Sequence, residues 1–232
     1  MSKIVVIHQP DFLPYLGFFH RFISADEFIV LDHVQFVNSA RGWTHRDKIK
    51  TASGEKWLSL SVKKAPRDTS INEIELSSSV DWATNNLNLI KQNYGNAPFF
   101  DEIFPLIITL YDKPPQLMVD FNLRSIELLM DLLNVRLPWV RSSALYPTGN
   151  SNDLLIDLLG KVGATHYLSG NGARNYMQPE KFYQANIQIM WQQFLHPVYP
   201  QQFGTFVPYL SSLDLLFNCG ITASQKILKD TV

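Results

Sequence analysis

Two short apolar runs and a helix-length segment between them open the chain. Ile4–Ile7 and Phe28–Leu31 are strand-length and rich in Ile and Val, and Gly17–Ile23 lies between them. Runs of this length, bounded by turn residues, are typical of buried strands, and the intervening segment is long enough for one helix. The pattern therefore predicts a βαβ unit whose two strands are parallel.

Polar residues stand where each of these two runs ends. His8 closes the first run and Asp32 follows the second. In open α/β sheets, ligands bind beyond the carboxyl ends of the strands. We therefore expect His8 and Asp32 to face one crevice and to be the catalytic residues of a site there.

The middle of the chain follows a different pattern. Lys48–Thr51 and Lys56–Val62 flank a glycine-bearing turn, which predicts a β-hairpin, and Ile71–Leu76 reads as a third strand beside it. Apolar residues then recur at helical spacing, which predicts a bundle of helices packed against the sheet. The predicted helices are Asp81–Tyr94, Pro98–Tyr111 and Gln116–Leu133.

The alternation of strand and helix resumes at Trp139. We predict one α/β domain over residues 1–232, with a mainly parallel Rossmann-like sheet, a small antiparallel hairpin insertion and a helical subdomain at about residues 81–135. The later predicted elements are a helix over Asn152–Val162, a strand over Thr165–Leu168, a short helix over Pro179–Tyr183, a strand over Ile187–Trp191, and two closing helices over Leu213–Phe217 and Thr222–Lys229.

The composition is that of an ordinary globular domain. Hydrophobic residues make up 46% of the 232 positions and the formal net charge is −1, a balance that points to no nucleic-acid or membrane surface. No apolar run approaches the roughly 20 residues of a membrane span. The one cysteine, Cys219, excludes internal disulfides. Because a strand pattern starts directly after Lys3, we expect no signal peptide and a cytoplasmic location.

A loop rich in rings and cations follows the second predicted strand. It carries Gln35, Arg41, Trp43 and Arg46. Guanidinium groups suit phosphate or carboxylate, and aromatic rings in the same loop can stack on a nucleotide or sugar. A solvated charged face is the alternative interpretation.

A second candidate turn directly follows the strand that ends at Leu168. Glycines in such a turn let the backbone approach a ligand, and an arginine can neutralise an anion there. An ordinary left-handed turn explains the same residues. The candidate residues of this turn are Ser169, Gly170, Gly172, Arg174 and Tyr176.

Histidines elsewhere leave two questions open. Gly17 and His20 resemble part of the H-x-G-H box of nucleotidyltransferases, but the box itself is absent because His8 lies twelve residues before His20. Two interpretations of His20 and His196 stay open: each histidine either binds a ligand or has a structural role. No spacing of His, Cys or carboxylates indicates a metal site. Asp11, Asp32 and Asp214 are the carboxylates able to serve as bases.

The whole chain resembles the WbqC-like family, whose members are encoded in bacterial O-antigen and other surface-polysaccharide gene clusters. One departure concerns the glycine-rich turn, where Asn175 stands at a position that is usually acidic. The matching segments are IHQPDFLPYLGFFHR at 7–21, LDHVQF at 31–36, RSS at 141–143, YLSGNGARNYM at 167–177, HPVYPQQFGTFVPYLS at 196–211 and DLLFNCG at 214–220.

This resemblance implies an enzyme that forms an amide, by acyl or aminoacyl (glycyl) transfer, on a nucleotide-linked amino sugar. It adds Gln9 and Tyr15 to the expected binding residues. The cofactor is left unknown, with ATP or an acyl or aminoacyl donor as candidates, and the oligomeric state is left open, a homodimer included. Two alternatives remain: an ATP-using, nucleotidyltransferase-like enzyme, and a non-catalytic protein that binds a sugar nucleotide in the same pathway.

Overall fold

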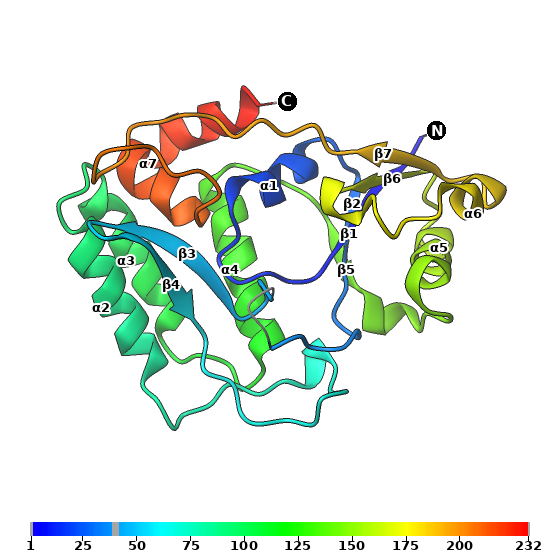
Figure 1. Ribbon diagram of the computed structural model, residues 1–232, viewed down its shortest axis with the longest axis horizontal. Helices are drawn as coiled ribbons and strands as arrows, with labels where there is room; N and C mark the ends of the chain where they lie inside the picture. Colours follow the sequence, from blue (N-terminus) through cyan, green and yellow to red (C-terminus); the bar gives the residue numbers. More distant parts are fainter. Residues whose placement is uncertain (1, 39–41, 232) are drawn as a thin grey trace.

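A five-stranded parallel sheet is the main feature of the computed structural model, which describes residues 2–38 and 42–231 (Figure 1). The strand order is β5-β2-β1-β6-β7, so the chain builds outward from β1 in one direction and then in the other. The order reverses between β1 and β6, which is the topological switch point where open α/β sheets bind ligands. The strands are β1 (Ile4–His8), β2 (Glu27–Val30), β5 (Trp139–Arg141), β6 (His166–Ser169) and β7 (Gln188–Trp191).

The predicted βαβ unit and α/β class are confirmed. β1 and β2 pair in parallel, with Val5 opposite Glu27 and His8 opposite Val30. α1 (Leu16–Ile23) connects them. Val5 is fully buried, as a strand covered on both faces requires.

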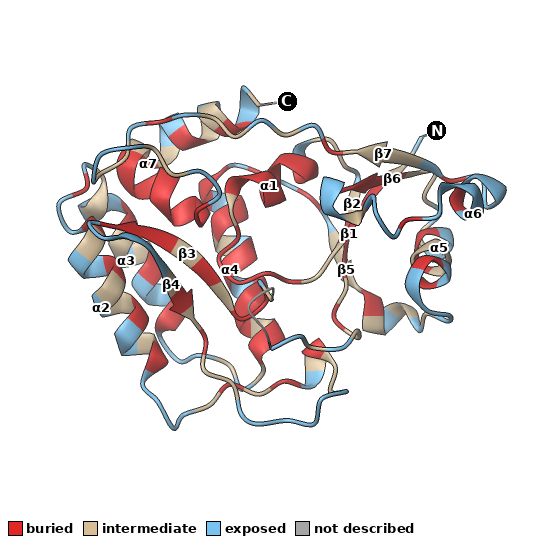
Figure 2. Cartoon of the chain, viewed as in Figure 1, coloured by how far each residue is buried: buried red, intermediate tan, exposed pale blue. Residues whose placement is uncertain are grey.

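Helices cover both faces of the sheet. α5 and α6 pack on one face, where Ile7, Leu158 and Phe182 belong to one buried apolar cluster. α1, α4 and α7 pack on the other face, in an apolar core that continues into α2 and α3 (Figure 2). No helix among the described residues has the length and apolar character needed to cross a membrane. The remaining helices are α2 (Trp82–Tyr94), α3 (Phe100–Tyr111), α4 (Met118–Leu132), α5 (Ser151–Lys161), α6 (Pro179–Gln184) and α7 (Ser212–Lys229).

The predicted hairpin is present, but the prediction of a third strand beside it is wrong. β3 (Arg46–Thr51) and β4 (Gly54–Ser59) pair antiparallel. Ile71–Glu73 instead forms a 3₁₀ helix, and the following residues contribute only isolated bridges. The Ser70 hydroxyl and the Glu73 carboxylate close this helix as a capping box, which draws the backbone away from a strand.

The C-terminal segment also differs from the expectation. The two predicted closing helices form one element, α7, broken at Gly220, where φ is 75° and ψ is 172°. The predicted start of α2 is confirmed, because the Asp81 carboxylate accepts a hydrogen bond from the Thr84 N–H at 3.0 Å. Two further 3₁₀ turns, Ser142–Leu145 and Asn171–Ala173, directly follow β5 and β6.

Candidate functional site

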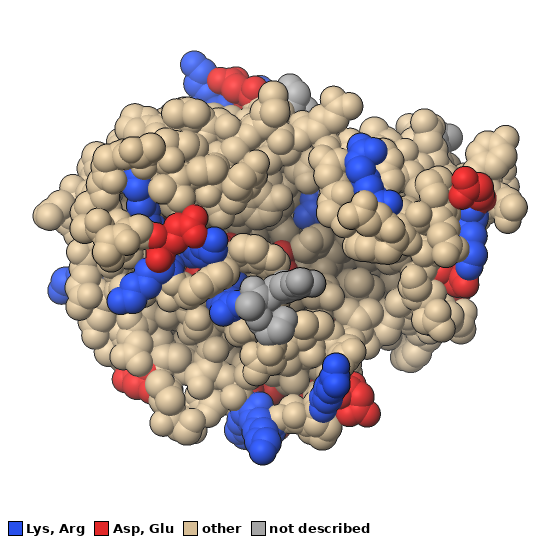
Figure 3. Space-filling model, in the orientation of Figure 1, with Lys and Arg blue, Asp and Glu red and all other residues tan. Residues whose placement is uncertain are grey.

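A hollow near the centre of one face lies between the sheet half and the helical half of the molecule (Figure 3). The carboxyl ends of β1 and β6 are neighbouring strand ends, and these two strands end at His8 and Ser169. The side chains around these strand ends are therefore the candidate site.

A buried arginine lies at this edge of the sheet. Arg21, on α1, is 3% exposed and forms no hydrogen bond or ion pair with any residue that the structure describes; its Nε is buried without a partner. Its guanidinium carbon lies 5.6 Å from the centre of the Phe18 ring. A Cβ atom placed on Gly170 would lie 3.8 Å from Nη1 of Arg21, so the turn after β6 borders the guanidinium. An unpaired buried cation is costly, which points to an anionic ligand.

Asp11 lies close to this arginine and titrates near neutrality. Asp11 is 8% exposed. Burial raises the pKa of Asp11 from 3.8 to about 7, although the positive charge of Arg21 acts in the opposite direction. A carboxyl group with such a pKa can take up and release a proton near pH 7, as a general acid or base must.

His8 is neutral in this environment. Burial, and secondly the charge of Arg21, lowers the pKa of His8 from 6.5 to about 3. Its Nδ1–H donates to the Gln9 carbonyl at 2.9 Å, and Nδ1 lies 3.5 Å from Oδ2 of Asp11. A histidine with a pKa of about 3 is a weak base at neutral pH. Of these two side chains, Asp11 is therefore better suited than His8, one of the predicted catalytic residues, to accept a proton near pH 7.

Asp32, the second predicted catalytic residue, is enclosed by protein. It is fully buried, and its carboxylate accepts hydrogen bonds from the hydroxyl groups of Ser142 and Ser143 at 2.9 and 2.8 Å and from the Ser143 N–H at 2.9 Å. These bonds join the end of β2 to the turn after β5. The geometry favours a positioning role for Asp32.

His20 has partners at both ring nitrogens. Its Nε2–H donates to the Thr231 carbonyl at 3.1 Å, and its Nδ1 accepts from the Gln192 amide at 3.2 Å. Gln192 also donates to the Gly17 carbonyl at 2.7 Å. A Cβ on Gly17 would lie 2.3 Å from the Tyr15 ring, so glycine is needed there for packing. His20 therefore joins α1 to the C-terminal segment, which weakens the nucleotidyltransferase alternative.

In the turn over residues 169–176, only the first residues lie beside Arg21. Asn171 donates to the Gln192 carbonyl at 2.8 Å, and its side-chain oxygen accepts from Arg174 Nε at 3.0 Å. The Arg174 guanidinium carbon lies 4.5 Å from the Trp191 ring centre. Gly172 and Tyr176 are exposed. Gly170 thus borders the guanidinium of Arg21, whereas Arg174 is held against the Trp191 ring.

The predicted aromatic and basic loop forms a stack on the β3–β4 hairpin. Trp43, 42% exposed, lies 5.5 Å from Trp57 between ring centres. The Arg46 guanidinium carbon and the Lys48 ammonium lie 4.1 and 5.2 Å from the Trp57 ring. We call these four residues the hairpin platform. Arg41 lies outside the described residues.

Buried hydrogen bonds join residues 43–44, at the start of the platform segment, to the loop after β1. The Phe12 N–H donates to the Trp43 carbonyl at 3.0 Å. The Asn122 amide, from α4, donates to the carbonyls of Pro10 at 2.7 Å and Thr44 at 2.6 Å. The structure therefore places the first histidine's loop next to the segment that carries the platform.

Two other predicted residues have mainly internal contacts. Gln35 donates to the Arg67 carbonyl at 2.7 Å. His196 donates from Nδ1 to the Pro197 carbonyl at 2.9 Å, and its buried Nε2 has no partner among the described residues. Four aromatic rings surround it: Phe194, Tyr199, Phe206 and Tyr209.

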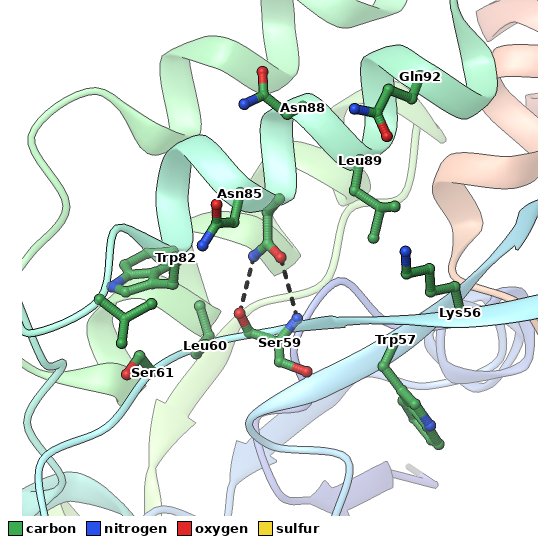
Figure 4. Close-up of a pocket in the computed structure, with 12 residues that line it drawn as sticks. Lys56, Trp57, Ser59, Leu60, Ser61, Trp82, Asn85, Asn88, Leu89 and Gln92 are labelled. Carbon is green, nitrogen blue, oxygen red and sulfur yellow. Dashed lines mark hydrogen bonds between the residues drawn. The ribbon is translucent and has the colours of Figure 1, made fainter.

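A separate groove of about 570 Å³ lies between β4 and α2 (Figure 4). Asn86 crosses it, since its amide accepts from the Ser59 N–H at 3.2 Å and donates to the Ser59 carbonyl at 3.1 Å. The Trp57 ring points away from the groove in Figure 4. Its lining, among the residues that the structure describes, includes Lys56 but no carboxylate or histidine.

Sequence reasoning missed Arg21. The available signal was a lone arginine within LGFFHRFI, an otherwise mostly apolar helix that follows the first strand. Asp11 was among the carboxylates considered, but its pKa depends on its burial and on the charge of Arg21, which only the folded structure reveals.

The strand order defines a doubly wound α/β protein, and the candidate site lies at its topological switch point. A family model described as the WbqC-like protein family matches residues 9–226, so the chain belongs to that family. An uncharacterized protein of Mycobacterium tuberculosis (strain H37Rv) is 28% identical over 225 residues, which cover 96% of each chain. No solved structure matches the chain.

Proposed function

We propose that this protein is an enzyme that forms an amide bond between an activated acyl or aminoacyl donor and the amino group of a nucleotide-linked sugar. Membership in the WbqC-like family supports a role related to polysaccharide biosynthesis. The observation that carries the proposal is that two unusual groups occur together at the switch point of the sheet. One is the carboxyl group of Asp11, whose pKa is about 7, and the other is the buried cation Arg21, which has no ion-pair partner among the described residues.

Amide formation needs a base and a positive charge, and Asp11 and Arg21 offer both. The amine nitrogen attacks the acyl carbon, a C–N bond forms, and the leaving group departs with its electron pair. Asp11 takes the proton lost by nitrogen and delivers it to the leaving group. Arg21 faces the carbonyl oxygen while negative charge develops on it. His8, neutral at pH 7, donates to the Gln9 carbonyl and holds the loop that presents Asp11.

The nucleotide part of the acceptor suits the hairpin platform. The exposed Trp43 ring offers a stacking surface, and the Arg46 and Lys48 cations lie over the neighbouring Trp57. Rings with adjacent cations favour a base and its phosphates. In this arrangement the platform positions the acceptor and the hollow performs the transfer.

The test is a search for product. The protein is incubated with nucleotide-linked amino sugars and activated acyl or aminoacyl donors, and mass spectrometry measures the acylated sugar nucleotide. We expect kcat/KM to rise with pH through about 7, because the ionised Asp11 is the active form. Asp11→Asn should lower kcat by about 100-fold or more and remove that rise.

A matched variant controls for the loss of one carboxylate. Asp101→Asn, on the exposed part of α3, should keep the rate and the pH profile of the unaltered enzyme. Product formation by Asp11→Asn at an unchanged rate and with an unchanged pH profile would refute the assignment of the base.

A further inference from the structure

The groove between β4 and α2 carries neutral polar groups on both of its walls. Three side-chain amides line it from α2: Asn85, Asn88 and Gln92 are three and then four residues apart, so they share one side of the helix (Figure 4). The hydroxyl groups of Ser59 and Ser61 line it from β4 and the residues that follow. None of these five side chains forms a hydrogen bond with another residue that the structure describes. Their donors and acceptors are therefore open to a ligand.

Apolar side chains line the groove between these polar groups. Leu60 and Trp82 are buried, and Leu89 is half-buried. The Trp82 ring is held in place by Tyr111 and Phe121, whose ring centres lie 5.8 and 5.2 Å away. The volume of about 570 Å³ lies within the range of small-molecule sites, roughly 300–1,000 Å³. The groove thus combines a fixed apolar surface with hydrogen-bonding groups at its walls.

This combination matches the chemistry of a carbohydrate. A sugar hydroxyl group both donates and accepts hydrogen bonds, and the amide group of Asn or Gln does the same. The C–H groups of a sugar ring are apolar and can pack on Leu89 and Trp82. A phosphate group offers acceptors alone, so the amide oxygens would face it without a donor. Lys56 is the one cation of the lining within the described part of the chain.

Two other kinds of ligand fit the groove less well. A nucleotide base needs a ring to stack on, but the Trp57 ring points away from the groove (Figure 4). An extended peptide would pair with the edge of β4. On that edge the Asn86 amide already bonds the N–H and the carbonyl of Ser59, at 3.2 and 3.1 Å.

We propose that the groove between β4 and α2 is a binding site for a neutral sugar unit of an oligosaccharide, held by the amides of Asn85, Asn88 and Gln92. The inference goes beyond the proposed function and is independent of it, because binding requires no acyl donor and no reaction.

The first test uses an array of neutral, acidic and phosphorylated oligosaccharides. The whole protein is displayed in many copies on fluorescent beads, so that weak individual binding is detected through multivalency. We expect neutral oligosaccharides to be bound in preference to acidic and phosphorylated ones. Binding to no sugar on the array, or a preference for the charged sugars, would overturn the inference.

The second test locates the binding with variants of α2. Calorimetry measures the dissociation constant of the neutral oligosaccharide that the array binds best. The triple variant Asn85→Ala, Asn88→Ala, Gln92→Ala should weaken binding by at least about tenfold, because it removes all three amides. These positions are exposed, and alanine favours the helix more than Asn or Gln does, so the variant should stay folded, which circular dichroism checks.

Asn93→Ala is the matched control. It also removes an amide from α2, but this amide donates to the Leu89 carbonyl at 2.8 Å and is not part of the groove lining. The dissociation constant should then change by less than about twofold. A folded triple variant that binds the sugar as tightly as the unaltered protein, or one weakened no more than Asn93→Ala, would show that the sugar binds elsewhere and that the groove assignment is wrong.

Discussion

At the scale of single residues, the raised pKa of Asp11 makes stability depend on pH in a defined direction. The folded protein holds the Asp11 proton up to about pH 7, whereas the unfolded chain releases it near 3.8. As the pH rises between these values, the unfolded state is increasingly favoured by this group. The full difference corresponds to about 4 kcal/mol as an upper limit.

Asp11→Asn should therefore gain stability relative to the unaltered protein as the pH rises from about 4 to about 7. His8 acts in the opposite sense, because its pKa of about 3 favours folding as the pH rises toward 6.5, but it is present in both proteins. Urea unfolding at several pH values gives the difference in free energy. A difference that stays flat with pH would show that Asp11 ionises normally.

Arg21 illustrates a conflict between stability and function. The guanidinium is buried without an ion-pair partner among the described residues, so the free protein carries its desolvation cost. Arg21→Met keeps the packing against Phe18 and removes the charge. We expect the free energy of unfolding to increase by about 1–3 kcal/mol in the absence of ligand. Urea unfolding measures the change in the free energy of unfolding. The control variant Arg136→Met should stay within about 0.5 kcal/mol of the unaltered protein. A clear loss of stability in Arg21→Met would show that Arg21 is a structural residue.

Only part of the candidate site could be predicted from the sequence, and the reason is physical. A strand end can be located from the local apolar pattern, so His8 was placed correctly at the end of β1. The chemical state of a side chain depends on burial and on charges brought together by the fold. Asp11 and Arg21 acquire their properties from such neighbours, whereas Asp32 loses access to a ligand through hydroxyl groups 110 and 111 residues away.

At the scale of elements, the sequence pattern correctly predicted those helices and strands whose ends are set by neighbouring residues. The first βαβ unit, the hairpin and the start of α2 follow from runs, turns and caps that lie within a few residues. Ile71–Leu76 was mistaken for a strand because its apolar residues, Ile71, Ile74 and Leu76, are buried without a continuous strand partner. The prediction failed where burial arose from packing against α4 and its flanks.

The break in α7 gives a prediction that contrasts two glycines. Gly220 has a φ of 75°, and a Cβ there would lie 2.5 Å from the Phe99 ring. Gly220→Ala should destabilise the protein by about 2 kcal/mol or more, because it adds both backbone strain and overlap. Gly160 lies inside α5 with no atom within 4 Å of its Cβ position. Gly160→Ala should stabilise the protein by about 0.5–1 kcal/mol. Thermal unfolding compares the two variants, and equal effects would contradict the argument.

At the scale of the whole molecule, one apolar core joins the sheet to the helical half. Val6 and Phe28 from the sheet belong to the same cluster as Phe121 from α4 and Leu213 from α7. The hollow lies over this junction, so the residues of the site come from both halves. A site built in this way keeps its geometry only while the two halves remain packed together.

We therefore expect the chain to unfold in a single cooperative transition. Trp139 and Trp191 lie in the sheet, whereas Trp43, Trp57 and Trp82 lie in or beside the hairpin and α2. Two variants, each with one of these sets replaced by Phe, allow fluorescence to follow each half separately during urea unfolding. Because a shared core couples the halves, both fluorescence curves should coincide with the loss of helix measured by circular dichroism, after correction for any shift in stability. Two separated transitions would show that the helical region folds independently, and the cleft would then be an interface between two domains that are free to move.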